Sequence, residues 1–239
     1  MAELLYQLNS YLKVFNATVV SVNKKEKAVE LDRTAFYPGG GGQPHDLGKL
    51  YLDEKKSIEV KRVKQEGGHI WHYVEGDLPK KRSAVKGSID WIRRHDLMRT
   101  HTALHVLCGV VWRDYGAQVT GGNMEPLQGR MDFEFETLER QLVREIEKKM
   151  NAEIEKGGEV RVKILPREEA FQIPDLIRTK INLLPPGIKE VRTVEIVGLD
   201  VQADGGTHVK NIKEIGKARI VNYKSKGRIN KRIFLELEE

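Results

Sequence analysis

The sequence predicts an α+β protein in two parts, a small β-barrel over residues 1–90 and an α+β domain over residues 91–239. Short segments of alternating apolar and polar residues, separated by turn residues, fill the first part. A proline-free stretch with helical spacing begins after Asp90, and strand-like segments return after Gly157-Gly158. The length of 239 residues suits one or two domains of ~100–200 residues each.

Five short segments of the first part have the alternating pattern of strands. They are residues 17–22, 28–32, 49–52, 57–62 and 69–74. The first two flank the turn sequence Asn23-Lys24-Lys25-Glu26 and therefore predict a β-hairpin. Gly67-Gly68 and Gly76 provide further turn signals. Several short strands joined by turns in this way favour a small barrel.

The second part is expected to contain two long helices and four strands. Residues 91 to about 115 place apolar residues at helical spacing, and residues 137–156 do the same, with Thr137 as the expected N-cap. The apolar positions are Leu97, Leu104, Leu107 and Val111 in the first helix, and Leu138, Leu142, Ile146 and Met150 in the second. The four strands are expected at residues 160–165, 191–197, 218–223 and 232–237.

Composition limits the class of protein more than it identifies a partner. The formal net charge is +6, from 41 Lys and Arg against 35 Asp and Glu. Basic clusters occur at Lys80-Lys81-Arg82, at Arg93-Arg94 with Arg99, and at residues 224–232. They permit an anionic partner, and equally suit the solvated surface of a charge-rich, heat-adapted protein. We expect a cytoplasmic location, because Cys108 is the single cysteine and no apolar run reaches the ~18 residues of a membrane span.

Two short segments together suggest a metal site. His101 and His105 are four residues apart, so on a helix they lie on one face about one turn apart. Far along the chain, Asp204 and His208 flank Gly205-Gly206, which allow the backbone to turn sharply. Three nitrogen or oxygen ligands and an open water position form the usual catalytic zinc site. Each segment alone is a weak signal, since short motifs often occur by chance.

Neighbouring residues refine this expectation. Zinc peptidases carry a general-base Glu directly after the first histidine, but here that position is Thr102, which disfavours peptide hydrolysis. Cys108 lies seven residues, about 10 Å along a helix, from His101 and is expected to be a buried core residue. No Gly-x-Ser-x-Gly motif indicates a serine nucleophile.

A glycine-rich stretch precedes these segments. Pro38 and Pro44 enclose four consecutive glycines and Gln43, an arrangement that suits either a backbone passing close to a ligand or a flexible hairpin tip. The Gly-Lys-Ser/Thr ending of a phosphate-binding loop is absent, so no nucleotide cofactor is expected.

Three motifs carry a resemblance to a known family. They are Gln43-Pro44-His45-Asp46-Leu47-Gly48, Met98-Arg99-Thr100-His101-Thr102-Ala103-Leu104-His105 and Val201-Gln202-Ala203-Asp204-Gly205-Gly206-Thr207-His208-Val209. In order and spacing they are similar to the editing modules of alanyl-tRNA synthetases. Over nearly the whole chain, the sequence resembles the stand-alone AlaX-type editing proteins in their medium-length form, which have an N-terminal β-barrel.

The resemblance implies a zinc-dependent editing hydrolase that deacylates mischarged seryl-tRNA(Ala), with glycyl-tRNA(Ala) as a further candidate. It implies His101, His105 and His208 as zinc ligands. Many relatives have Cys where this chain has Asp204, so Asp204 is expected either to bind zinc through oxygen or to lie just outside the ligand shell. Zinc would activate a water molecule or position the substrate.

Editing needs groups that recognise the extra hydroxyl of serine, since a site built to bind a hydroxyl discriminates by up to ~10⁴–10⁵-fold. Gln43 and Thr120 are the candidates for this catalytic-site role, although Thr120 also suits a turn before two glycines. The basic clusters would contact tRNA phosphates. Two other functions remain open, a tRNA- or ribosome-associated binding module with a structural metal and a metal-dependent hydrolase of small esters or amides. The oligomeric state is not predicted.

Overall fold

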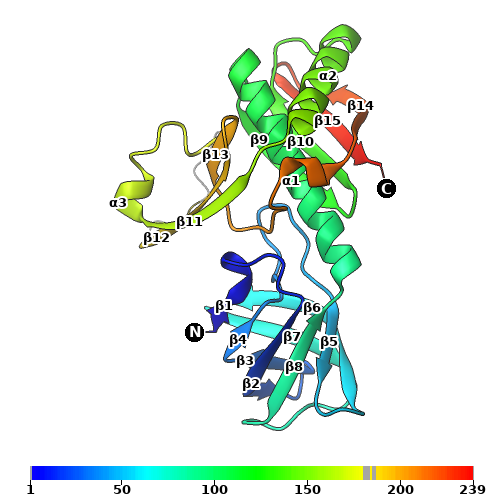
Figure 1. Cartoon of the computed structure of the whole chain (residues 1–239), viewed down its shortest axis with the longest axis vertical. Helices are drawn as coiled ribbons and strands as arrows, with labels where there is room; N and C mark the ends of the chain where they lie inside the picture. Colours follow the sequence, from blue (N-terminus) through cyan, green and yellow to red (C-terminus); the bar gives the residue numbers. More distant parts are fainter. Residues whose placement is uncertain (1, 180–183, 185–186, 239) are drawn as a thin grey trace. The chain divides into compact units, whose positions relative to one another are not determined.

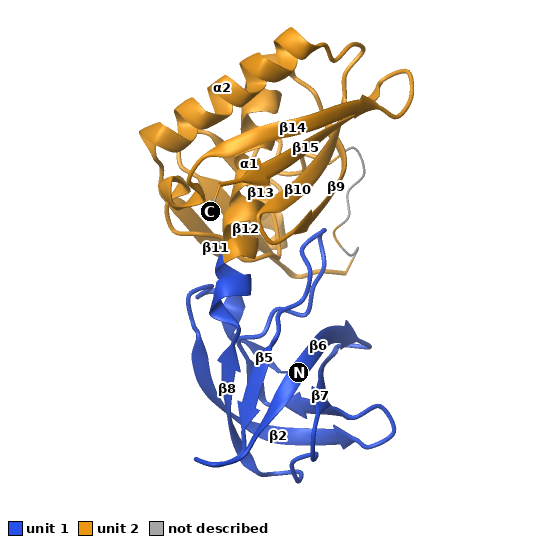
Figure 2. Cartoon of the chain, turned by 90° about the vertical axis from the view of Figure 1, so that its right-hand side faces the viewer, with its two compact units in different colours: residues 1–95 blue, residues 96–239 orange. Residues whose placement is uncertain are grey.

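The computed structural model describes residues 2–179, 184 and 187–238, and the chain divides into two compact units, residues 1–95 and 96–239 (Figure 2). The division falls within helix α1 (Trp91–Tyr115). The expected assignment of residues 1–90 and 91–239 to separate functional domains stays a prediction. Strands and helices occur together, which confirms the predicted α+β class. None of the described helices is both long and apolar enough to cross a membrane.

The first unit contains a closed barrel of antiparallel strands, so the predicted barrel is confirmed (Figure 1). In spatial order the strands are β2 (Val14–Asn23), β3 (Ala28–Leu31), β7 (His69–Glu75), β6 (Ser57–Glu66), β5 (Gly48–Tyr51) and β8 (Ala84–Ile89). Strand β8 pairs with β2 and closes the barrel. The predicted hairpin is β2–β3, with Asn23 opposite Ala28.

Strand β8 was not predicted, because its sequence contains Gly87 and Ser88 and few strand-forming residues. Packing explains the glycine, since a Cβ at position 87 would lie 2.4 Å from the ring of Phe15. The short strands β1 (Glu3–Leu4) and β4 (Arg33–Thr34) pair in parallel beside the 3-10 helix η1 (Leu5–Gln7).

The second unit is built on a four-stranded antiparallel sheet. Its order is β14 (Ala218–Ser225), β15 (Asn230–Leu237), β10 (Gln128–Glu134) and β9 (Val119–Glu125). Helices α1 and α2 (Arg140–Lys156) lie behind this sheet in Figure 2. Position 129 on β10 must be small, because a Cβ at Gly129 would lie 3.0 Å from Leu104 of α1.

A three-stranded antiparallel sheet completes the second unit. It consists of β11 (Val160–Pro166), β12 (Glu190–Ile196) and β13 (Asp200–Ala203). The short helix α3 (Arg167–Ala170) follows β11, and the 3-10 helix η2 (Ile212–Ile215) follows the loop after β13. The predicted strands at 160–165, 191–197, 218–223 and 232–237 are β11, β12, β14 and β15. Strands β9, β10 and β13 were missed, and Gly121-Gly122 explains the weak signal of β9.

The first predicted helix is confirmed as α1, but the start predicted for the second was wrong. Helix α2 begins at Arg140 with Glu139 as its N-cap, and no side chain caps it, so Thr137 lies outside the helix. Its buried stripe also differs from the predicted one and consists of Val143, Ile146, Met150 and Ile154. Because Leu138 and Leu142 are only half-buried, the helix is rotated relative to the prediction.

Candidate metal centre

The second unit brings four predicted side chains together. His101 and His105 lie one turn apart on α1, and Asp204 and His208 lie in the loop between β13 and η2. One ligand atom from each residue lies within 4.8 Å of the others, so the group could hold a metal ion. Three of the four residues are buried and Asp204 is nearly so.

The two carboxylate oxygens of Asp204 lie close to one nitrogen of each imidazole. Asp204 Oδ1 lies 3.4 Å from His101 Nε2 and 3.9 Å from His105 Nε2, and Asp204 Oδ2 lies 3.1 Å from His208 Nε2. Ligands on a tetrahedral zinc ion lie about 3.3 Å apart, given bonds of ~2.0–2.1 Å. The imidazole rings themselves are 4.3–5.0 Å apart between centroids.

The protonation states also suit a cation. Burial lowers the pKa of His208 to about 4 and that of His101 well below its usual value, although Asp204 opposes both shifts. Burial alone would raise the pKa of the Asp204 carboxyl, but the surrounding imidazoles hold it well below its ordinary range. Near pH 7 these groups are therefore two neutral imidazoles and a carboxylate, the forms that bind metals.

Arg192 of β12 fixes the Asp204 segment, and nothing in the spacing of the sequence indicated it. Its Nη1 donates a hydrogen bond to the Asp204 carbonyl oxygen at 2.8 Å and lies 3.7 Å from Oδ2. The Asp204 N–H donates to the Arg192 carbonyl oxygen, and the Gly206 N–H donates to Asp204 Oδ2 at 2.6 Å. The carboxylate is thus oriented by its own loop and by the neighbouring strand.

The glycine-rich stretch of the first unit forms a turn, and its two interpretations, a backbone passing close to a ligand and a flexible hairpin tip, both stay predictions. Residues 39–42 all have positive φ, at 84°, 136°, 57° and 89°, which is why glycine occupies each of them. Gly40 and Gln43 exchange two backbone hydrogen bonds, and Tyr37 Oη donates to the Gly40 carbonyl oxygen at 3.0 Å. The Gln43 residue itself is buried.

A buried ion pair holds this loop to the first turn of α1. Arg94 is fully buried and binds both carboxylate oxygens of Asp46, and it also donates to the carbonyl oxygens of Ser10 and Ala35. Asp46 accepts a further hydrogen bond from the Tyr37 N–H at 2.6 Å. Arg94 therefore has a structural role, and its expected contact with tRNA phosphate was wrong.

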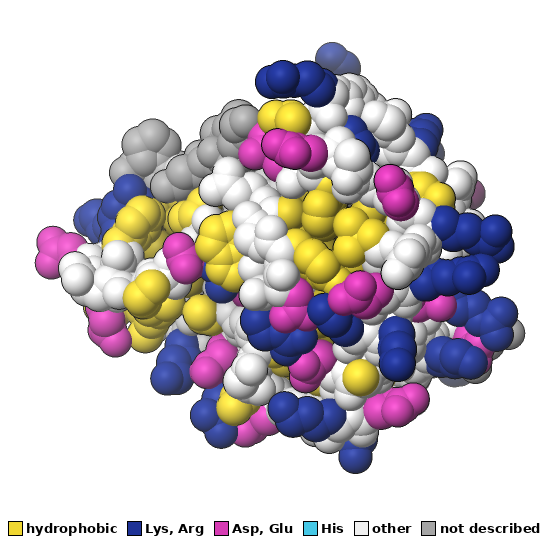
Figure 3. Space-filling model, turned by 90° about the horizontal axis from the view of Figure 1, so that it is seen from above, with side chains coloured by type: hydrophobic (Ala, Val, Ile, Leu, Met, Phe, Trp, Pro, Cys, Tyr) yellow, Lys and Arg dark blue, Asp and Glu magenta, His cyan; other side chains and the backbone are white. Residues whose placement is uncertain are grey.

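The other basic clusters are also partly occupied within the protein. Arg99 donates to the carbonyl oxygens of Ile215 and Glu238. In the 224–232 cluster, Arg232 pairs with Asp132 at 2.6 Å, and the buried Lys231 donates to two loop carbonyl oxygens. Lys80-Lys81-Arg82 remain exposed. Figure 3 shows acidic and basic side chains interspersed on the face that it displays.

Thr120 and Cys108 have different surroundings from the four clustered side chains. Thr120 is exposed on β9, and its hydroxyl donates to Asn230 Oδ1 at 3.2 Å. Its expected role in recognising serine therefore stays a prediction, as does that of Gln43. Cys108 is buried as expected, and burial raises the pKa of its thiol far above the usual value, so the thiol is an unreactive core group.

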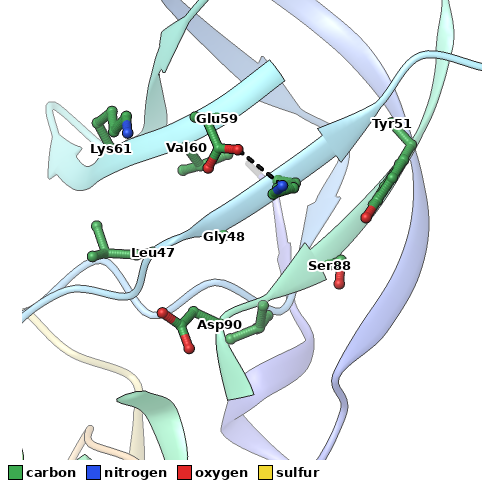
Figure 4. A pocket seen from close by; sticks show the side chains of 10 residues that line it. Leu47, Gly48, Tyr51, Glu59, Val60, Lys61, Ser88 and Asp90 are labelled. Carbon is green, nitrogen blue, oxygen red and sulfur yellow. Dashed lines mark ion pairs between the residues drawn. The ribbon is translucent and has the colours of Figure 1, made fainter. Parts of the chain in front are cut away.

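The first unit contains a pocket on its barrel. It is lined by residues of β5, β6 and β8, including Tyr51 and Ser88 (Figure 4). Its charged groups include the ion pair between Lys49 and Glu59, at 3.1 Å. None of its lining residues belongs to the histidine and aspartate cluster. The cluster is therefore the stronger candidate for a reactive site.

Comparison with known proteins identifies the family. The chain is 41% identical to an alanyl-tRNA editing protein AlaX-M of Saccharolobus solfataricus over 237 residues, covering 98% of each chain. It is 40% identical to the AlaX-M protein of Methanosarcina barkeri, covering 99% of each. The chain belongs to the AlaX-M family of alanyl-tRNA editing proteins. The predicted resemblance is thereby confirmed.

This chain is also similar to part of a larger synthetase. An alanine–tRNA ligase of Pyrobaculum aerophilum is 40% identical over 230 residues, which cover 91% of this chain and 25% of the ligase. Residues 191–234 match the family described as threonyl and alanyl tRNA synthetase second additional domain. Residues 7–93 match the family described as tRNA synthetases class II (A). The match over residues 191–234 includes Arg192, Asp204 and His208, and thus two of the four residues of the candidate centre.

Proposed function

We propose that this AlaX-M protein is a zinc-dependent deacylase that removes serine from mischarged seryl-tRNA(Ala), with glycyl-tRNA(Ala) as a second candidate substrate. The observation that carries the proposal is the convergence of three buried imidazoles and one carboxylate in a chain whose relatives are alanyl-tRNA editing proteins. The reaction is hydrolysis of the ester between the amino acid and the terminal ribose, which releases free serine and tRNA.

Zinc is one of the ions that the donor set fits, and it is the ion that the family resemblance implies. Imidazole nitrogens suit zinc, copper, iron and nickel, whereas magnesium and calcium prefer sites made of oxygen. A set of three imidazoles and one carboxylate is therefore not typical of a magnesium or calcium site. His101, His105 and His208 would hold the ion, and Asp204 would either be a further ligand or lie just outside the ligand shell. When bound, zinc would supply either an activated water molecule or a positive centre that positions the ester.

The chain's own residues would provide the remaining tasks. Arg192 and the Gly206 N–H orient the Asp204 carboxylate. Gln43 and Thr120 stay our candidates for hydrogen bonding to the serine hydroxyl, because a synthetase pocket for alanine rejects an added hydroxyl by only ~10²-fold. Exposed cations such as Lys80-Lys81-Arg82 would contact tRNA phosphates, so binding should weaken with salt. We place this activity in the cytoplasm.

The decisive experiment compares deacylation of seryl-tRNA(Ala) and alanyl-tRNA(Ala) by the wild type and by His101→Ala, with the metal content of both measured. We expect rapid release of serine by the zinc-loaded wild type, sparing of alanine, and loss of both zinc and activity in the variant. Absence of turnover by zinc-loaded wild type would refute the proposal. Thr120→Val should lower the preference for serine over alanine, and an unchanged preference would remove Thr120 from this role.

One observation favours a second function, a tRNA-binding module with a structural metal. The cluster offers four protein groups, and four protein ligands are the usual number for a closed structural zinc site. This alternative predicts tight tRNA binding, zinc-dependent folding and no turnover. The same assay with free serine esters in place of tRNA separates both functions from a hydrolase of small esters, which would need no tRNA.

A further inference from the structure

The buried hydroxyl of Thr102 joins the two segments of the candidate centre. Thr102 follows His101 on α1 and is fully buried. Its Oγ1 lies 2.8 Å from the Met98 carbonyl oxygen, 3.2 Å from the Val209 nitrogen and 3.2 Å from His208 Nδ1. Two of these partners belong to the distant loop that carries His208. The hydroxyl therefore connects the helix to the second half of the cluster.

The number of protons available allows two arrangements of these hydrogen bonds. A threonine hydroxyl has one proton to donate and two lone pairs to accept. In the first, the hydroxyl proton goes to the Met98 carbonyl oxygen, which can only accept, and in the second it goes to His208 Nδ1. The Val209 N–H can only donate, so it occupies one lone pair. In the first arrangement the remaining lone pair accepts from His208 Nδ1, which then carries the ring hydrogen; in the second, Nε2 carries it and donates to Asp204 Oδ2.

With its hydrogen on Nδ1, a neutral His208 presents a lone pair at Nε2. That nitrogen lies 3.1 Å from Asp204 Oδ2, and Oδ2 already accepts the Gly206 N–H. A nitrogen lone pair and a carboxylate oxygen repel each other unless a cation lies between them. A shared metal ion requires the first arrangement, and in that arrangement the hydrogen bonds of Thr102 hold the His208 ring in the tautomer and orientation of a ligand.

We propose that Thr102 is the positioning residue that makes His208 a metal ligand, an inference that rests on the metal-binding part of the proposed function. In zinc peptidases the same position after the first histidine holds the general-base Glu. In this chain it holds a buried hydroxyl that contacts the third imidazole. Removing such a hydrogen-bond partner of a ligand typically weakens metal affinity by ~10–100-fold.

The test measures zinc dissociation constants by chelator competition for the wild type, Thr102→Val and Thr102→Ser. Valine has the same shape but removes the hydroxyl, whereas serine retains it. Thr100→Val is the matched control, because Thr100 is also fully buried on α1 and its hydroxyl also donates to a carbonyl oxygen one turn earlier, that of Asp96. We expect a ~10–100-fold weaker affinity for Thr102→Val and near wild-type affinity for Thr102→Ser and Thr100→Val.

Three results would overturn the proposal. The first is wild-type zinc affinity in folded Thr102→Val, and the second is equal weakening in Thr100→Val. The third result concerns the wild type and decides the matter if Thr102→Val does not fold. It is a long-range ¹H–¹⁵N spectrum of the zinc-loaded protein that shows His208 bound to zinc through Nδ1. Failure of the wild type itself to bind zinc would instead refute the metal part of the proposed function.

Discussion

Replacing Arg94 by methionine should destabilise the protein more than any nearby surface change. Methionine retains much of the side-chain length but removes the donors to Asp46, to the Ser10 carbonyl oxygen and to the Ala35 carbonyl oxygen. The Asp46 side chain is 1% exposed, so its charge would stay buried and would keep the hydrogen bond from the Tyr37 N–H. Breaking a buried pair in this way costs about 3–5 kcal/mol.

For a chain of this size, 1 kcal/mol changes the melting temperature by about 2–4 °C, so Arg94→Met should lower it by ~6–20 °C. Scanning calorimetry measures this change directly. Hydrogen exchange should show faster exchange of the Gly40 and Gln43 amides, which are paired across the glycine-rich turn. The double variant Arg94→Met with Asp46→Asn should recover part of the loss, because it removes the unpaired charge.

Arg93→Met is the matched control, since Arg93 is adjacent but only half-buried and donates one long hydrogen bond, of 3.4 Å, to the His45 carbonyl oxygen. It should change the melting temperature by no more than ~2–4 °C. A similar decrease for Arg93→Met and Arg94→Met, or a decrease below ~3 °C for Arg94→Met, would refute the argument that the buried pair stabilises the loop.

Three further outcomes are expected. Burial lowers the pKa of His72 to about 4, below the unfolded value of 6.5, so its contribution is complete above pH 6.5 and is lost as the pH falls toward 4. Loss of this contribution should lower the free energy of unfolding by about 2 kcal/mol between pH 7 and 5. In urea unfolding, His72→Gln should therefore show a shallower pH dependence of stability than the wild type. Gly87→Ala should cost about 1–3 kcal/mol in the same assay, because its Cβ would lie 2.4 Å from Phe15. Asp204→Asn should weaken zinc binding by more than ~100-fold if Asp204 is a direct ligand, whereas a ~10–100-fold loss in chelator competition would place it outside the ligand shell.

The parts of the molecule that the sequence predicts are those with local geometric rules. His101 and His105 share a face of α1 because four residues make about one helical turn. The β2–β3 hairpin follows from alternation around a polar turn. The second pair, Asp204 and His208, lies in a loop, where no such rule applies. The resemblance of its motif to a known family predicted that this pair would join His101 and His105, and the structure places all four side chains together.

The missed features depend on contacts between residues that are distant in sequence. Strand β8 contains Gly87 because the Phe15 ring of another strand occupies the space of a side chain. Arg192 precedes Asp204 by a full strand and hairpin, yet the pairing of β12 with β13 brings it to the Asp204 carbonyl oxygen. Spacing along the chain cannot indicate such a partner, because the register of the strands is set by the folded sheet.

The basic clusters show why charge alone is a poor guide to a partner. Arg93 and Arg94 are adjacent and chemically identical, but a helix turns by about 100° per residue, so neighbouring side chains face different surroundings. Arg94 faces the buried Asp46, which lies far away in the sequence, while Arg93 stays half-exposed. A cation is available to bind phosphate only if the fold offers it no carboxylate or carbonyl oxygen. The cluster 80–82, exposed on the first unit, meets this condition better than Arg94, Arg99 or Lys231 and is where salt-dependent tRNA binding should be tested first.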